Sequence, residues 1–132
     1  MSKKTEREVA PGRFAYEGLE RALHEKARLG IMTCLVGRPG GIVFSELKDL
    51  CSLTDGNLSR HLDVLKDDNL VEVWKGFEGR RPQTLVRLTK PGRQRFLDYL
   101  SELERVIKDA IPAAKAAKEA KPGKLGPGWV PA

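Results

Sequence analysis

The spacing of the hydrophobic residues changes at Asn69, and this change constrains the fold more than any other feature of the sequence. Before it, leucines recur at three- and four-residue steps, the spacing of one buried helix face, at Leu58, Leu62 and Leu65. After it, hydrophobic residues alternate with polar ones along 70–75 and again along 84–88, as in half-buried β-strands. The sequence therefore predicts a helix that leads directly into a β-hairpin.

The first part of the chain is predicted to form a helix, a minimal strand and a second, short helix. An apolar stripe that ends at Gly37 marks the first helix, at Leu19, Leu23, Ala27, Ile31 and Leu35. The β-branched and aromatic run 42–44 predicts the strand. Ser45 is then placed to cap a helix that runs from Glu46 to about Cys51.

The second part is predicted to hold the leucine-backed helix, the hairpin and a last helix. Thr54 is suited to cap a helix running to about Asp68, the hairpin loop spans 76–83, and Thr89 caps the last helix. An apolar seam continues along that helix, at Phe96, Leu100, Leu103 and Ile107. This order of elements predicts an α+β, mainly α fold, a winged helix-turn-helix with a C-terminal helix.

Composition divides the chain into three parts. Residues 1–14 are polar and without period, which predicts a flexible arm; 15–111 carry the folded domain; and 112–132 form a Lys/Ala/Pro/Gly-rich tail that we expect to be largely disordered. No apolar stretch approaches the roughly 18 residues of a membrane span, and the N-terminus lacks the apolar core of a secretory signal. We therefore expect a cytoplasmic protein without membrane contact.

Positive charge is concentrated between Lys75 and Arg95. This window holds seven basic residues and a single acidic one, Glu78, so it carries the whole net charge of +6. A localised cationic stripe on an otherwise balanced domain is typical of a surface that binds a polyanion such as DNA.

The motifs of enzyme sites are missing from the sequence. There is no Gly-rich phosphate loop, no H-E-x-x-H and no nucleophile elbow, and the only histidines are His24 and His61. We expect no catalytic activity and no cofactor.

Two cysteines, Cys34 and Cys51, lie within apolar helical patterns and form no C-x-x-C pair, so no metal site is predicted. They are predicted to be thiols packed in the core, with a thiol sensor as the alternative, and they could meet across the first two helices.

The helix predicted over 54–68 has a polar side that can enter a major groove. With Leu58 pointing inward and a step of about 100° per residue, Gly56 and Arg60 point outward and Asn57 lies on a flank. Asn57 and Arg60 are the predicted base readers, because Asn pairs with adenine and Arg with guanine for about 1–3 kcal/mol of discrimination each. Gly56 is expected either to let the backbone approach DNA closely or to meet a packing need of the neighbouring helix.

Short or medium polar side chains at the rim of this helix are expected to contact phosphates, at Thr54, Ser59 and His61. His61 lies nearer the inward side, so a half-buried structural role is the alternative. Arg80 and Arg81 at the hairpin tip, together with Lys75, are expected to reach the DNA backbone or an adjacent minor groove. Trp74 and Phe77 are expected to pack within the hairpin rather than to bind a ligand.

Residues 53–66 followed by Asn69-Leu70-Val71 resemble the recognition helix and first wing strand of ArsR-type and MarR-type regulators of bacteria and archaea. Leu88-Thr89 and Pro91-Gly92-Arg93 are similar to the end of the wing and the start of the last helix in these families. Asn69 stands where these families often have Gly, a departure that an Asn tolerates in left-handed conformation. Metal sensing is not expected, because the paired cysteines of ArsR-type sensors are missing from the corresponding helices.

The resemblance implies a homodimer formed by the first and last helices and bound to a pseudo-palindromic site. The residues expected at the dimer contact are Leu19, Leu23, Phe96, Leu100, Leu103 and Ile107.

The combined expectation is a transcriptional regulator that binds double-stranded DNA sequence-specifically. The helix over about 54–68 would lie in the major groove and the basic loop 76–83 on the backbone or minor groove. Two alternatives stay open: a winged helix that binds protein or RNA, and an architectural DNA binder without strong sequence preference, helped by the Lys-Ala tail. Nothing in the sequence identifies a small-molecule effector.

Overall fold

The chain folds into a small antiparallel sheet whose base packs against helices, in a computed structural model that describes residues 10–118 and 120–132. The elements are α2 (Lys26–Val36), β1 (Ile42–Val43), α3 (Phe44–Cys51), α4 (Asp55–Asp67), β2 (Val71–Glu78), β3 (Arg81–Leu88) and α5 (Lys90–Ala117). Residues 1–9 of the predicted N-terminal arm lie outside the described residues.

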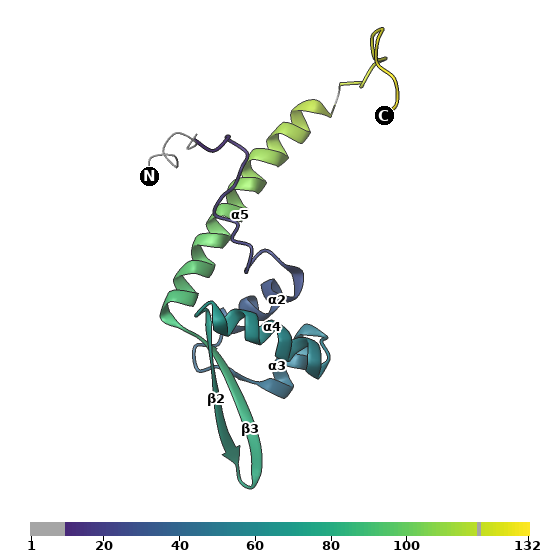
Figure 1. Ribbon diagram of the computed structural model, residues 1–132. Coiled ribbons are helices and arrows are strands. Elements are labelled where there is room, and N and C mark those ends of the chain that lie inside the picture. Colours follow the sequence, from purple (N-terminus) through teal and green to yellow (C-terminus); the bar gives the residue numbers. More distant parts are fainter. Residues whose placement is uncertain (1–9, 119) are drawn as a thin grey trace, which may run out of the picture.

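The sheet has the strand order β1-β3-β2, with both pairings antiparallel. Figure 1 shows the β2–β3 hairpin projecting from the cluster of α2, α3 and α4, while α5 extends away from that cluster in the opposite direction. Ile42 pairs with Val86, and Val71 pairs with Leu88. The α+β, mainly α winged helix with a C-terminal helix, expected from the order of elements, is confirmed.

The core is formed where the inward faces of the helices meet the base of the sheet. Leu58, Leu62 and Leu65 are at most 5% exposed, so the predicted buried face of α4 is confirmed. Helix α4 packs against α2 and β2, and these leucines share one cluster with Leu23, Ile31, Met32, Leu35, Ile42, Leu47, Leu70, Val71, Val86, Phe96 and Tyr99. Burial of this apolar face holds the polar face of α4 outward.

The first helix begins later than predicted. The apolar spacing placed its start near Leu19, but residues before Lys26 form turns, such as the one in which the Leu19 N–H donates to the Tyr16 carbonyl. Glu25 has an extended backbone, and its carboxylate accepts the Arg28 N–H at 2.9 Å, which makes it the N-cap of α2. The same hydrogen bond lowers the pKa of Glu25. The Glu25 cap therefore sets the start of α2, although the apolar spacing continues further toward the N-terminus.

The start of α3 also differs from the prediction. The helix begins at Phe44, with Val43 as N-cap and no side-chain capping bond, instead of after Ser45. Val43 pairs with Leu85 in the sheet, so the strand β1 runs straight into the helix.

The hairpin is longer and its loop shorter than predicted. Strand β2 continues to Glu78 and β3 begins at Arg81, which leaves Gly79 and Arg80 as a two-residue turn instead of a loop over 76–83. Gly79 has φ of 64°, and a glycine at the first central position gives a turn that matches the twist of paired strands. The hairpin therefore carries Arg80 at the tip of a continuous ladder.

Helix α4 ends in a Schellman motif that turns the chain into β2. The Leu70 N–H donates to the Leu65 carbonyl at 2.8 Å and the Asn69 N–H to the Lys66 carbonyl at 2.9 Å. Asn69 has φ of 57°, so the prediction that it adopts a left-handed conformation is confirmed.

Helix α5 starts at the predicted cap and runs into the predicted tail. The Thr89 Oγ1 accepts the Gly92 N–H at 2.8 Å, and the helix continues through Pro112 to Ala117, so it includes the first residues of the predicted tail. The N-terminal segment lies along α5 (Figure 1): Arg13 pairs with Asp109 at 3.1 Å, and the Tyr16 hydroxyl donates to the other oxygen of that carboxylate.

The Gly92→Ala substitution should destabilise the protein, because a Cβ at this position would lie 2.0 Å from the Leu70 carbonyl oxygen. We expect the free energy of unfolding, measured by urea denaturation, to fall by about 2 kcal/mol or more. Gly56→Ala is the matched control, since a Cβ there meets nothing within 4 Å and alanine favours the helix. Equal stability of the two variants would contradict this account.

Candidate nucleic-acid interface

The turn between α3 and α4 fixes where α4 begins. Ser52 closes α3 in left-handed conformation with φ of 54°, and the Leu53 N–H donates to the Lys48 carbonyl at 3.1 Å. Thr54 then caps α4 as predicted: its Oγ1 accepts the Asn57 N–H at 3.1 Å. The hydroxyl hydrogen of Thr54 stays available to an acceptor outside the helix.

The two predicted base readers lie together on the first turns of α4. Arg60 is exposed and Asn57 half-buried, and the Arg60 Nη2 donates to the Asn57 Oδ1 at 2.8 Å. Gly56 is exposed one residue before Asn57, and a Cβ added to it would meet nothing within 4 Å. The alternative that Gly56 serves helix packing is therefore wrong.

Helix α4 does not by itself form a cationic surface. Asp63 and Asp67 are exposed on it, and Asp55 at its start pairs with Lys48 at 3.1 Å. Attraction for a polyanion must come mainly from neighbouring elements.

A groove of about 340 Å³ separates α4 from the hairpin, and it brings Ser59 of α4 and Lys75 of β2 to one place. The residues lining it are Phe44, Ser59, Leu62, Asp63, Lys66, Val73, Lys75 and Thr84. The Lys75 ammonium donates to the Thr84 hydroxyl at 3.3 Å. Lys66 was missed by the sequence analysis, although its position two turns after Ser59 places both on one side of α4.

The cationic window splits into a free and a neutralised part. Lys75, Arg80 and Arg81 are exposed on the hairpin. Arg87 instead pairs with Glu72, and this bond lowers the pKa of Glu72.

Arg95 is neutralised in the same way by two acidic residues. It binds Glu20 and, at 2.9 Å, Asp68, and these bonds raise its own pKa. Lys90 and Arg93 are exposed at the start of α5, where Arg93 donates to the Val36 carbonyl at 3.2 Å. The basic residues of the window that lie beside α4 are therefore those of the hairpin.

Two aromatic side chains of the hairpin are exposed, although Trp74 packs within the hairpin against Arg87 as expected. Phe77 is 73% exposed and Trp74 is 52% exposed, with the Arg87 guanidinium 5.5 Å from the Trp74 ring centre. Because side chains alternate along a strand, Phe77 lies on the same face as Lys75, the face that borders the groove beside α4. Continuing the alternation of β2 beyond Lys75 would have placed Phe77 there from the sequence.

His61 lies against α2, in line with a half-buried structural role. Its side chain is 15% exposed, and its Nδ1 is 3.3 Å from the Arg28 Nη1 and 3.9 Å from a Glu25 carboxylate oxygen.

The residues expected at a dimer contact fall into two groups. Leu23 and Phe96 are fully buried within the single chain, so their assignment to a partner contact is corrected. Ile107 is 49% exposed and lines a groove of about 450 Å³ on α5. Leu100 and Leu103 line the same groove and, like Leu19, also pack against the core.

Within residues 10–118 and 120–132, no three or more His, Cys, Asp or Glu side chains gather in a way that could hold a metal ion. No helix of this described part is long and apolar enough to cross a membrane.

Comparison with known proteins identifies the family of this fold. A family model described as a winged helix DNA-binding domain matches residues 27–107, from α2 through the hairpin and into α5. The chain belongs to this winged helix DNA-binding family. The resemblance stated from the sequence is therefore confirmed at the level of the family.

This winged helix protein is also similar to individual proteins in sequence or fold. The structure of a transcriptional regulator homologue from Pyrococcus horikoshii is 35% identical, with a TM-score of 0.66 over 70% of this chain and 90% of that chain. An uncharacterized protein of Methanocaldococcus jannaschii is 36% identical over 66 residues, 50% of this chain and 72% of the relative. The repressor CouR, solved on a 23-mer DNA duplex, shares the fold with 18% identity and a TM-score of 0.56, over 76% of this chain and 78% of its own.

Proposed function

We propose that this winged helix protein is a transcriptional regulator that binds double-stranded DNA sequence-specifically, with α4 in the major groove and the β2–β3 hairpin on the backbone or minor groove. One observation carries the proposal: Asn57 and Arg60 are joined on the first turns of α4, beside a cationic hairpin. The P. horikoshii relative is a transcriptional regulator homologue, and CouR, which shares the fold, binds a DNA duplex. A regulator of this kind acts by occupying DNA and needs no catalytic group.

Base reading is assigned to Arg60 and Asn57. One guanidinium nitrogen of Arg60 is engaged by the Asn57 Oδ1, and the remaining donors can address the O6 and N7 atoms of guanine. The Asn57 amide keeps an N–H to donate to the N7 atom of an adenine, and the second lone pair of its Oδ1 can accept the adenine N6–H. Gly56 supports a close approach, because no side chain stands between the α4 backbone and a base edge.

Phosphate contacts are assigned to both sides of the groove beside α4. Thr54 and Ser59 supply hydroxyl groups, and Lys75, Arg80 and Arg81 supply the charge that the acidic α4 lacks. His61 would add a contact only through the Nε2 of its ring, since its Nδ1 faces α2. Backbone contacts of this kind set affinity and position, whereas the contacts of α4 set sequence preference.

A second copy of the chain is proposed to pack on the apolar groove of α5. Leu97 and Ile107 are 39% and 49% exposed there, and Leu100 and Leu103 extend the same face. A two-fold pair would present two α4 helices to half-sites one helical turn apart. We also propose that 15–111 act as the DNA-binding domain and that the residues after α5 add little to it.

Arg60→Ala should relax sequence preference without unfolding the protein, because the side chain is exposed and contacts only Asn57 among the described hydrogen bonds. Selection of random duplexes on the purified variant should give a motif in which the discrimination between bases at one position falls by about 1–3 kcal/mol. Arg105→Ala, which removes an exposed arginine from α5, should leave the motif unchanged. No enriched motif with the unaltered protein would favour a protein or RNA interaction module instead.

Arg80→Ala/Arg81→Ala should lower affinity by a similar factor for every duplex, since backbone charge carries no sequence information. The slope of log affinity against log salt should become shallower by about 2. Lys115→Ala/Lys118→Ala removes the same charge from the end of α5 and should change neither quantity. A larger loss in this control than in the hairpin variant would support the architectural alternative.

Ile107→Glu should separate the proposed dimer, because a carboxylate would be buried against the partner copy without a counter-charge. Sedimentation should show a dissociation constant at least about tenfold weaker. Lys108→Glu places the same side chain on the next, exposed position and should leave the dimer intact. Equal dissociation constants for the two variants would place the partner elsewhere.

A further inference from the structure

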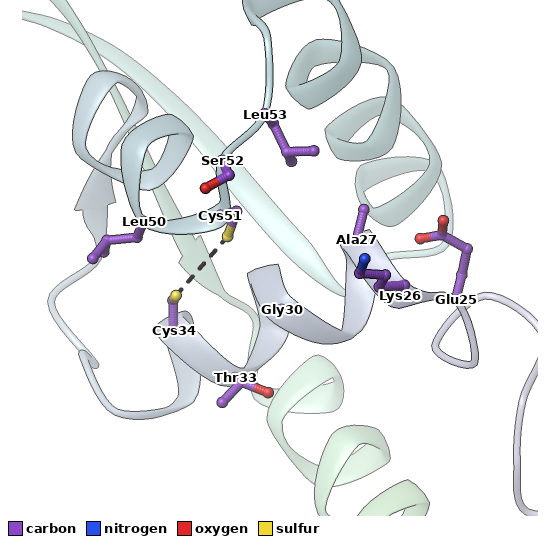
Figure 2. A pocket seen from close by; sticks show the side chains of 10 residues that line it. All are labelled: Glu25, Lys26, Ala27, Gly30, Thr33, Cys34, Leu50, Cys51, Ser52 and Leu53. Atoms are coloured by element: carbon purple, nitrogen blue, oxygen red, sulfur yellow. Dashed lines mark hydrogen bonds between the residues drawn. The ribbon is translucent and has the colours of Figure 1, made fainter.

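The two cysteines meet in an open pocket that the DNA interface does not use. Figure 2 shows Cys34 of α2 and Cys51 of α3 facing one another, and the distance between their Sγ atoms is 4.0 Å. The pocket has a volume of about 700 Å³ and is bordered by Thr33, Leu50 and Ser52. Both cysteines are only partly buried, so the prediction of thiols packed in the core is only partly met.

Local sequence explains why the two sulfur atoms approach. Cys51 is the last residue of α3, and its Sγ lies against α2 where Gly30 has no side chain, since a Cβ at Gly30 would be 3.9 Å from it. Cys34 follows Gly30 by one helical turn and so projects toward the same place. The contact joins the two helices, and the cysteines are 17 positions apart along the chain.

We propose that Cys34 and Cys51 form a redox-active dithiol, which closes to an internal disulfide when a small organic disulfide enters the pocket. One thiolate attacks a sulfur of the oxidant RSSR, which forms a mixed disulfide and releases RS⁻. The second cysteine then attacks the protein sulfur of that mixed disulfide, and its proton passes to a released thiolate. The protein loses two electrons and two protons, and the oxidant is reduced to two RSH molecules.

The geometry allows this closure. A disulfide needs about 2.05 Å between the sulfur atoms, so closure has to shorten the present 4.0 Å by about half. Burial and the neighbouring Cys34 raise the pKa of Cys51 to about 11. The pair therefore holds at least one proton at neutral pH, and this proton passes to a released thiolate when the disulfide closes.

The position of Cys51 links this pair to α4. Ser52, Leu53 and Thr54 are the only residues between Cys51 and the first turn of α4. A bond that draws Cys51 toward α2 acts on this turn and hence on the start of the proposed recognition helix. This consequence rests on the proposed function, and we expect the oxidised protein to bind DNA at least about fivefold more weakly, within the usual range of coupling between two sites.

The disulfide itself is tested on the full chain without DNA. The reduced protein is treated with glutathione disulfide, alkylated and weighed by intact mass spectrometry. We expect that neither cysteine of the oxidised chain is alkylated. Its mass should be that of one reduced, unalkylated chain minus two hydrogen atoms, and dithiothreitol should restore both thiols. Under the same treatment, Cys51→Ser should retain glutathione on Cys34. Two thiols that still alkylate, or disulfides between chains, would overturn the proposal.

The link to DNA is tested separately, on a duplex recovered by selection with the reduced protein. Oxidation should weaken binding of the unaltered chain, whereas Cys34→Ser/Cys51→Ser should bind like the reduced protein and ignore the oxidant. Equal affinity of the reduced and disulfide forms would overturn the link. Failure of the reduced protein to select any duplex would instead overturn the proposed function and leave the disulfide result standing.

Discussion

The contact between α5 and the Leu70 backbone is the constraint on which the rest of the structure depends. The Leu70 N–H closes α4, its carbonyl oxygen accepts the Thr89 N–H, and Gly92 lies so close that no side chain fits between. The Thr89 hydroxyl adds a bond to the Asn69 carbonyl at 2.7 Å. The end of α4, both ends of the hairpin and the start of α5 are therefore tied at one backbone position. Because backbone packs directly on backbone at this junction, the helix proposed to read DNA and the hairpin beside it keep a fixed relative orientation.

Some arginines of the protein form ion pairs that stabilise the fold, and other basic residues stay exposed to solvent. Arg95 bridges Glu20 and Asp68, which ties the N-terminal segment to α5 and to the end of α4. Arg87 is held by Glu72 on the hairpin. What remains exposed beside α4 is the charge of Lys75, Arg80 and Arg81. In the proposed function, this division gives affinity to the hairpin and sequence preference to α4, so the two properties can be altered separately.

The turn before α4 connects the cysteine pair to the start of the proposed recognition helix. On one side it carries the Thr54 cap that fixes the first turn of α4, and on the other it begins at Cys51, whose sulfur faces Cys34. A helix start is sensitive to its cap, which contributes about 1 kcal/mol. In the proposed redox pair, a change at the sulfur atoms would reach Asn57 and Arg60 through the short turn that joins Cys51 to α4.

The sequence by itself determined the features that depend on residues within one or two turns. These are the capping residues, the buried leucine face of α4 and the left-handed exit from it, at Thr54, Thr89, Leu58, Leu62, Leu65 and Asn69. Tertiary structure decided which arginines are free, and it brought together Cys34 and Cys51, a contact that the sequence offered only as a possibility. Those outcomes depend on partners distant along the chain, such as Glu20 for Arg95, 75 residues apart. Local periodicity holds no information on such pairs, because they form only when packing brings separate elements together.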